Sequence, residues 1–323
     1  MNEKTASDYL SPPTSGLNFE EAFVYESDCV YSCAPGMIGS YSDNSFFIVT
    51  RELNNPGPFD QSERIVKFNL EDGSSTENIY SHTDLVSKQL HIVDNKLVVI
   101  GGQYVNTYNL DFSGDPTTTM HGKLLTRFGM AVQDDIAYIV GGDYNTDPNT
   151  NLPIDADKIF GWNLNTQTLS SIATMPAQRF GARSSIINNK LYVFGGTAEF
   201  DNYPAHNTIF IHDLESGTVE TLNLPYEPDY THVDKRENLI YVVGHIIIRD
   251  GDGFIQDRIV RFGVFNTTTN TYTDIDTNID DNDTTSTIHG MCVFNNKMYM
   301  IYGNEDTMGT TYPQYSVMSA DLE

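Results

Sequence analysis

A fourteen-residue pattern occurs six times along the chain and constrains the fold more than any other feature of the sequence. Most copies place a polar turn pair ahead of alternating large apolar and aromatic residues, and three copies end in a glycine pair. Polar turn residues beside such alternation predict a hairpin of two short strands. The copies are IGSYSDNSFFIVTR from Ile38, QLHIVDNKLVVIGG from Gln89, GMAVQDDIAYIVGG from Gly129, RSSIINNKLYVFGG from Arg183, HVDKRENLIYVVGH from His232 and GMCVFNNKMYMIYG from Gly290.

The spacing of the copies predicts a propeller. They recur about every 50 residues, which is the length of a four-stranded blade. Each hairpin is followed by a third strand, such as TIFIHDLE from Thr208, then by a Gly or Asn turn and a fourth strand. We therefore predict one all-β domain over residues 1–323, a six-bladed propeller with four antiparallel strands per blade. Its blades should start near residues 36, 87, 127, 180, 231 and 288.

The two ends of the chain predict how the ring closes. The segment SGLNFEEAF from Ser15 resembles the fourth strand SGTVETL from Ser216, whereas the C-terminal strand YSVMSADLE has no successor. We expect residues 15–25 to be the outer strand of the last blade, so that no strand edge is left between the first and last blades. Residues 1–14 should form a frayed terminus.

The glycine pairs and one aromatic position in the third strand resemble the kelch-repeat family, including bacterial six-bladed propellers such as N-acetylneuraminate epimerases. The resemblance covers nearly the whole chain and implies the propeller fold, but it indicates function only weakly because propeller loops carry the activity. The matching positions are Gly101-Gly102, Gly141-Gly142 and Gly195-Gly196, with the aromatics Phe68, Tyr108, Trp162 and Phe262. The departures are Thr50-Arg51, Gly244-His245 and Tyr302-Gly303 at the glycine pair, and His212 at the aromatic.

Charge narrows the classes of partner. Lys and Arg total 18 against 44 Asp and Glu, a formal net charge of −26. Such a field repels phosphate backbones and anionic membranes, so we expect neither nucleic acid as a partner nor membrane insertion. The sequence has no long apolar run and no signal-peptide pattern, which predicts a soluble protein, either cytoplasmic or exported with its signal already removed.

Cysteines and acidic runs give little support for redox or metal chemistry. Cys29, Cys33 and Cys292 are too few for a disulfide scaffold; we expect free thiols, with one disulfide possible. The DGDG turn at Asp250 lacks the first and last oxygen ligands of a calcium loop. We expect no cofactor, and only opportunistic calcium binding at the runs Asp155–Lys158 and Asp280–Asp283.

Binding residues are expected where the repeats differ most. The connection between the second and third strands is long and variable in five repeats, and variable loops at one position of a repeat are typical recognition sites. The motif RFG before two of the inner strands adds arginines there, and the resemblance implies that these hold carboxylates of peptides or acidic sugars. Pairing of each arginine with an acidic residue of a neighbouring blade is equally consistent with the sequence. The candidate ligand-binding residues are Arg51, Arg127, Tyr144, Arg179, Arg183, Tyr203 and His245.

Two histidines are weak candidates for catalysis. His232 and His289 enter the fifth and sixth repeats at comparable positions, and imidazole titrates near neutral pH. A structural role for each is the simpler reading. The leading hypothesis is a binding propeller that recognises a protein, a peptide segment or a carbohydrate. The alternative is a small-molecule isomerase or mutarotase of the sugar-acid type, with its site at the mouth of the central channel.

Overall fold

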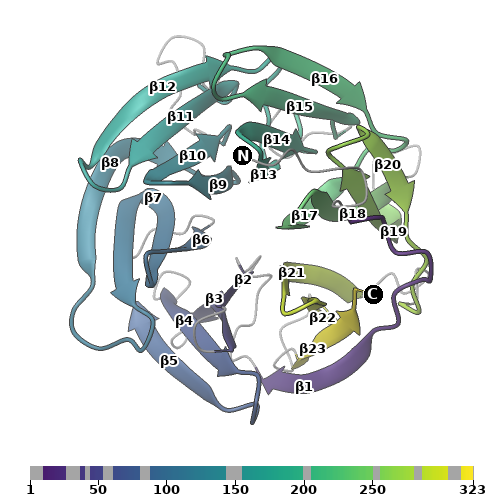
Figure 1. Ribbon diagram of the computed structural model, residues 1–323. Helices are drawn as coiled ribbons and strands as arrows, with labels where there is room; N and C mark the ends of the chain where they lie inside the picture. The colour runs from purple at the N-terminus through teal and green to yellow at the C-terminus, as the bar shows by residue number, and fades with distance from the viewer. Residues whose placement is uncertain are drawn as a thin grey trace, which may run out of the picture.

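The computed structural model describes residues 10–26, 37–40, 44–53, 61–80, 88–142, 155–198, 205–249, 255–279, 286–304 and 314–322. These residues form strands and connecting turns, with no helix among them and hence none that is long and apolar enough to span a membrane. Six small antiparallel sheets stand around a common centre (Figure 1). The predicted six-bladed propeller is therefore confirmed.

The blades follow one another in chain order. The first blade contains β2 (Met37–Ser40), β3 (Ser45–Leu53), β4 (Gln61–Asn69) and β5 (Ser75–Tyr80). The third contains β9 (Gly129–Gln133), β10 (Ile136–Val140), β11 (Lys158–Asn163) and β12 (Thr168–Thr174). The fourth contains β13 (Arg183–Ile187), β14 (Lys190–Phe194), β15 (Thr208–Asp213) and β16 (Val219–Asn223). The fifth contains β17 (Asp229–Arg236), β18 (Leu239–Arg249), β19 (Ile255–Asn266) and β20 (Thr271–Asp274).

The second blade has a compact form. It consists of β6 (Lys88–Val93), β7 (Lys96–Asn109) and β8 (Thr117–Leu125). The first half of β7 pairs with β6 and its second half pairs with β8, so this one element takes the second and third strand positions. Gly102, at the junction of the two halves, has a φ of 56°. The connection between the second and third strand positions, which is long in the other five repeats, is thus absorbed here into a continuous strand.

The polar turn pairs form the inner hairpins for a conformational reason. Asn188 and Asn189 both have positive φ, at 50° and 58°, and Asn295 and Asn296 repeat this geometry. Two successive residues with positive φ make the type I′ turn that matches the twist of a two-residue hairpin. Asn tolerates this region better than other non-glycine residues. The turn pair therefore fixes the register of the first two strands in these blades.

The hydrophobic core lies between successive blades. One cluster joins Ala131 and Val140 of the third blade to Ile186 and Val193 of the fourth, and other neighbouring pairs of blades pack in the same way. The innermost strands β2, β6, β9, β13 and β17, together with β21 (Ser286–Phe294), each contact their neighbours around the ring. The third-strand aromatics are buried, at most 4% exposed, and include Phe68, Tyr108, Trp162 and Phe262.

The N-terminal strand closes the ring. The sixth blade contains β21, β22 (Lys297–Asn304), β23 (Gln314–Asp321) and, outermost, β1 (Glu20–Glu26). β1 pairs with β23 from Glu20 opposite Ser319 to Glu26 opposite Gln314. Figure 1 shows β1 and β23 side by side, purple against yellow. The predicted closure of the last blade by an N-terminal strand is confirmed.

The residues before β1 lie against the fifth blade instead of extending the strand. Leu17 donates its backbone N–H to the carbonyl of Asp276, and both Leu17 and Phe19 are buried. The side chain of Asn278 binds the backbone of Phe19 twice: Oδ1 accepts the Phe19 N–H at 2.7 Å, and Nδ2 donates to the Phe19 carbonyl at 2.9 Å. Asn238 clamps Leu10 in the same way, at 2.8 and 3.0 Å. The chain therefore ties the fifth and sixth blades together before β1 begins at Glu20.

Several predicted features lie outside the described residues. They are Cys29 and Cys33, the loop aromatics Tyr144 and Tyr203, and the acidic runs Asp250–Gly253 and Asp280–Asp283. Cys292 is a buried free thiol in the core between the sixth and first blades.

Candidate functional site

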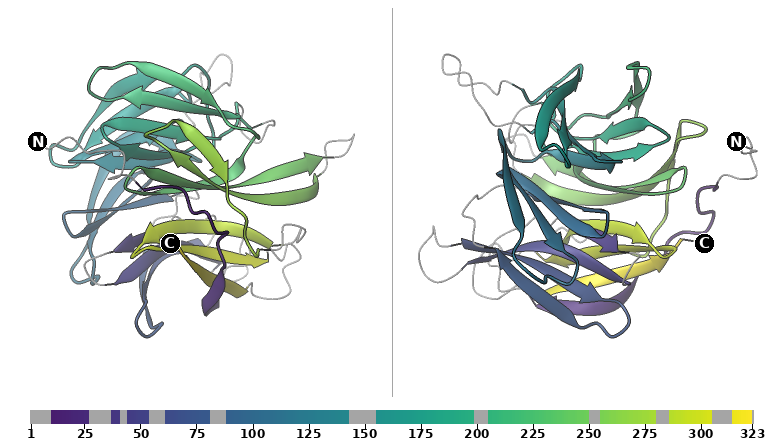
Figure 2. Two further views of the ribbon diagram at one scale, coloured as in Figure 1. Left: turned by 45° about the vertical axis from the view of Figure 1, so that its right-hand side comes forward. Right: turned by 60° about the vertical axis from the view of Figure 1, so that its left-hand side comes forward.

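The strand order decides which connections share an end of the ring. In an antiparallel blade, the turns after the first and third strands lie at one end, and the connections after the second and fourth strands lie at the other. The long predicted loops and the segments that join blades therefore share one end, which we call the long-loop end. At this end the hairpin of β18 and β19 pairs as far as Arg249 opposite Ile255 and extends beyond the ring (Figure 2).

Arg179 lies at this end and is committed to the scaffold. Its side chain is 1% exposed. Nη1 donates to the carbonyls of Gly195 and Thr208, at 2.6 and 3.1 Å, and Nη2 donates to the Thr208 hydroxyl at 2.6 Å. Burial lowers the pKa of Arg179 to about 10, which still leaves it charged at neutral pH. The guanidinium thus joins the segment before the fourth blade to that blade's second and third strands.

Arg127 belongs to the first RFG motif and contacts the second one through its backbone. Its carbonyl accepts the N–H of Gly181, and its φ is 48°. Phe128 and Phe180 of the two motifs are both buried. The repeated motif therefore builds the junction between the third and fourth blades, which the sequence alone did not show. Contact of Arg127 or Arg179 with a ligand stays a prediction.

Arg183, four residues after Arg179, is placed differently. It begins the innermost strand β13 and is half-buried. Nη1 donates to the carbonyls of Phe128 and Ala182, at 3.3 and 3.0 Å. Nη2 and Nε have no hydrogen-bond partner among the residues that the structure describes. Arg183 therefore has donor groups left for a ligand, whereas both terminal nitrogens of Arg179 already donate to the fourth blade.

The three histidines singled out in the sequence lie on neighbouring strands, and one of these strands, β17, contacts the strand β13 of Arg183. His232 lies in β17, His245 in β18 and His289 in β21, and they are 9%, 1% and 3% exposed. The charges of Arg183 and of the other two histidines all act on His232. We call His232, His245 and His289 the histidine cluster; it lies where the fourth, fifth and sixth blades meet.

The hydrogen bond of His232 fixes its protonation state. Nε2 lies 3.1 Å from the carbonyl oxygen of Ile288, and because a carbonyl only accepts, Nε2 carries the proton. Burial lowers the pKa of His232 well below its ordinary value, and Arg183 lowers it further. His232 is therefore neutral at physiological pH and joins the fifth blade to the sixth. Its role as an acid or base stays a prediction.

Sequence reasoning missed two charged residues that bridge three blades. Asp234 and Lys235 follow His232 in β17, and Asp234 accepts the N–H of Val293 in the sixth blade at 2.7 Å. Lys235 donates to the carbonyl of Ile186 in the fourth blade. Burial raises the pKa of Asp234 to about 6 and lowers that of Lys235. The signal was present in the sequence, since VDK is the most charged stretch of any inner strand.

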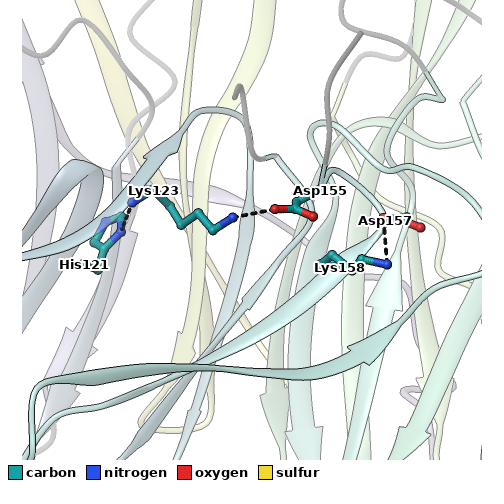
Figure 3. A network of polar contacts seen from close by, with 5 residues as sticks. All are labelled: His121, Lys123, Asp155, Asp157 and Lys158. Atoms are coloured by element: carbon teal, nitrogen blue, oxygen red, sulfur yellow. Dashed lines mark hydrogen bonds and ion pairs between the residues drawn. The ribbon is translucent and has the colours of Figure 1, made fainter. Parts of the chain in front are cut away.

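The remaining candidates are partly described. Arg51 pairs with Glu63 through the backbone of β3, but its side chain lies outside the described set, as do Tyr144 and Tyr203. The two carboxylates of the Asp155–Lys158 run form ion pairs (Figure 3): Oδ2 of Asp155 lies 2.5 Å from Nζ of Lys123, and Oδ1 of Asp157 lies 3.6 Å from Nζ of Lys158. Among the described residues, no three His, Cys, Asp or Glu side chains are grouped to hold a metal ion. Opportunistic calcium binding stays a prediction.

A separate histidine gives a test of acid stability. Burial lowers the pKa of His121 from 6.5 to about 4, and its ring packs edge-on to Trp162 at 6.1 Å. Since the folded pKa is the lower one, His121 contributes stability above pH 6.5 that is lost as the pH falls through about 4. We expect His121→Gln to reduce the acid destabilisation by up to about 3 kcal/mol. Urea unfolding at several pH values measures this, and parallel pH profiles for the two proteins would contradict it.

Comparison with known proteins agrees with the fold. No family model matches the chain. The chain is similar to the Kelch-like protein terF of Aspergillus terreus (strain NIH 2624 / FGSC A1156), with 26% identity over 166 residues that cover 47% of this chain and 36% of that protein. The chain thus matches little more than a third of the relative's own length. The partial match and the six-bladed ring together confirm the resemblance that the glycine pairs and third-strand aromatics indicated.

Proposed function

We propose that this kelch-repeat propeller is a binding protein that captures a carboxylate-bearing peptide segment or carbohydrate at its long-loop end. Binding of a ligand or of another protein accords with the propeller fold and with the similarity to a kelch-like protein. A closed ring of blades holds its inner strands rigidly, which suits a preorganised binding site. The variable loops at the same end would supply specificity.

Arg183 carries the proposal. Nη1 donates to two backbone carbonyls, whereas Nη2 and Nε make no hydrogen bond to the described residues. A guanidinium held through one nitrogen presents its other donors in a fixed plane, the arrangement that suits the two oxygens of a carboxylate. Arg179 lacks this freedom because both of its terminal nitrogens are bonded within the fourth blade.

The charge of the protein limits the kind of anion. With a net charge of −26, the chain repels anions at long range. A site that contains one half-buried arginine offsets this only locally, because exposed charges are screened beyond about 10 Å. We therefore expect ligands with one carboxylate to bind better than polyanions.

The isomerase alternative has less support. Proton transfer needs an acid or base within reach of the substrate. His232 donates to the carbonyl of Ile288 through Nε2, which leaves only Nδ1 for proton transfer. The sugar-acid isomerase stays a prediction that needs a turnover assay.

A panel of matched ligands tests the binding role. Thermal-shift screening would use glucuronate against glucose, and short peptides with a free C-terminal carboxylate against their amides. We expect the acidic member of a pair to stabilise the protein. We also expect Arg183→Gln to weaken its binding about 10- to 100-fold, through loss of charged hydrogen bonds of about 1.5–3 kcal/mol.

Arg261→Gln is the matched control, since Arg261 is exposed on β19 and the substitution changes net charge equally. Unchanged affinity in Arg183→Gln, or an equal loss in both variants, would refute the assignment of the site to Arg183.

A further inference from the structure

His232 lies on β17, which contacts both β13, the strand of Arg183, and β21, the strand of His289. The charged and titratable groups that act on His232 are Arg183 on β13, His245 on β18 and His289 on β21. No carboxylate is among them. Asp234, two residues along β17, is engaged by the N–H groups of Val293 and Lys235. Arg183 therefore supplies positive charge beside His232, and no carboxylate is among the groups that act on this histidine.

The second ring nitrogen of His232 is open to a ligand. Because Nε2 donates to Ile288, Nδ1 of the neutral ring holds a lone pair. Nδ1 has no hydrogen-bond partner within the described part of the chain, and neither do Nη2 and Nε of Arg183. An anion at Arg183 would be repelled by the lone pair on Nδ1. It would be attracted once Nδ1 carries a proton, because the protonated ring donates through both nitrogens.

We propose that Arg183 and His232 form a proton-linked anion site, in which a carboxylate or sulfate group binds between the guanidinium and the imidazolium while one proton is taken up from solvent onto Nδ1 of His232. This inference rests on the proposed function and adds a pH dependence to it. It assigns His232 a ligand-contacting role through Nδ1 while Nε2 keeps its bond to Ile288.

The electrostatics of the cluster make the coupling strong. Arg183, His245 and His289 all disfavour a charge on His232. A bound anion reverses this, since an opposite charge within about 4–6 Å favours the charged form of a titratable group. The coupling is reciprocal: the factor by which a bound anion raises the proton affinity of His232 equals the factor by which the proton raises the affinity for the anion.

Sulfate is the probe, because its own charge is constant over the pH range of the test. Isothermal titration of the wild-type protein with sodium sulfate, at constant ionic strength between about pH 5.5 and 7.5, should show affinity rising as the pH falls. Uptake of one proton gives up to about a tenfold change in dissociation constant per pH unit. Repeating the titration at one pH in two buffers of different ionisation enthalpy should return about one proton taken up.

Two variants locate the proton. His232→Gln retains an amide donor for Ile288 but cannot titrate, so sulfate should still bind and the pH dependence should disappear. His121→Gln, outside the cluster, should retain the pH dependence. If His232→Gln does not fold, the two-buffer measurement on the wild-type protein decides.

The outcomes separate this inference from the proposed function. The proton-linked site is overturned if sulfate does not bind, if its affinity does not depend on pH, or if no proton is taken up. It is also overturned if the pH profile is unchanged in His232→Gln, since sulfate would then be an adventitious ion only. The proposed function fails separately, if carboxylate ligands bind Arg183→Gln as well as wild type.

Discussion

Deleting residues 1–26 is expected to abolish the cooperative unfolding transition or to lower the melting temperature by more than about 10 °C. The deletion removes β1 and leaves the outer edge of β23 unpaired. It also removes Leu17 and Phe19, which are 3% and 2% exposed and pack among residues of the fifth and sixth blades. Loss of two such side chains costs about 5–8 kcal/mol, which is comparable to the whole stability of many domains.

Point variants separate packing from strand pairing. Phe19→Ala should cost about 3–5 kcal/mol because its ring packs against Phe262 at 5.3 Å in a buried cluster. Val24→Ala, on β1 but 47% exposed, should change stability by less than about 0.5 kcal/mol. Calorimetry and urea unfolding give both values. A deletion protein that melts at the wild-type temperature would refute the role of this segment in closing the ring.

Replacing Gly141 by alanine is expected to destabilise the protein by more than about 4 kcal/mol. Gly141 has a φ of 63°, and an added Cβ would lie 2.1 Å from the carbonyl oxygen of Arg179 and 3.1 Å from that of Ala156. Both contacts are with backbone, so the segment that carries Arg179 would have to move. The glycine pair therefore permits the close approach that places Arg179, and four residues later Arg183, at the long-loop end.

Gly217→Ala is the matched control. Gly217 has a φ of 72°, but an added Cβ there has no atom within 4 Å. It should cost about 1–2 kcal/mol from backbone conformation alone. The difference between the two variants in urea unfolding measures the steric contribution. Equal losses would show that only the positive φ matters at Gly141.

The fold followed from the sequence because its signal is local and repeated. Turn pairs such as Asn188-Asn189 fix the hairpins, and the spacing of the copies gives the number of blades. The unpaired strand at the C-terminus and the strand-like segment at Ser15 predicted closure. The exact start of β1 was not predictable, since it depends on Asn278 and Asp276, which bind the preceding residues from more than 250 positions away.

The sequence predicted candidate site residues but not the contacts that each of them makes in the fold. Arg179 and Arg183 look alike in sequence, yet one donates to the carbonyls of Gly195 and Thr208 and the other to those of Phe128 and Ala182. Which donors stay open depends on backbone carbonyls brought near by the packing of blades, and no local pattern encodes that. The convergence of the histidine cluster depends in the same way on three neighbouring blades.

The most direct test of the binding site is a crystal structure of the protein soaked in selenate at about pH 5.5, read by the anomalous signal of selenium. Selenate has the shape and charge of sulfate, and its position can be identified without bias. We predict a peak within hydrogen-bond distance of Arg183 Nη2 or Nε and of His232 Nδ1. Selenate bound elsewhere on the ring, with none between Arg183 and His232, would contradict the site proposed here.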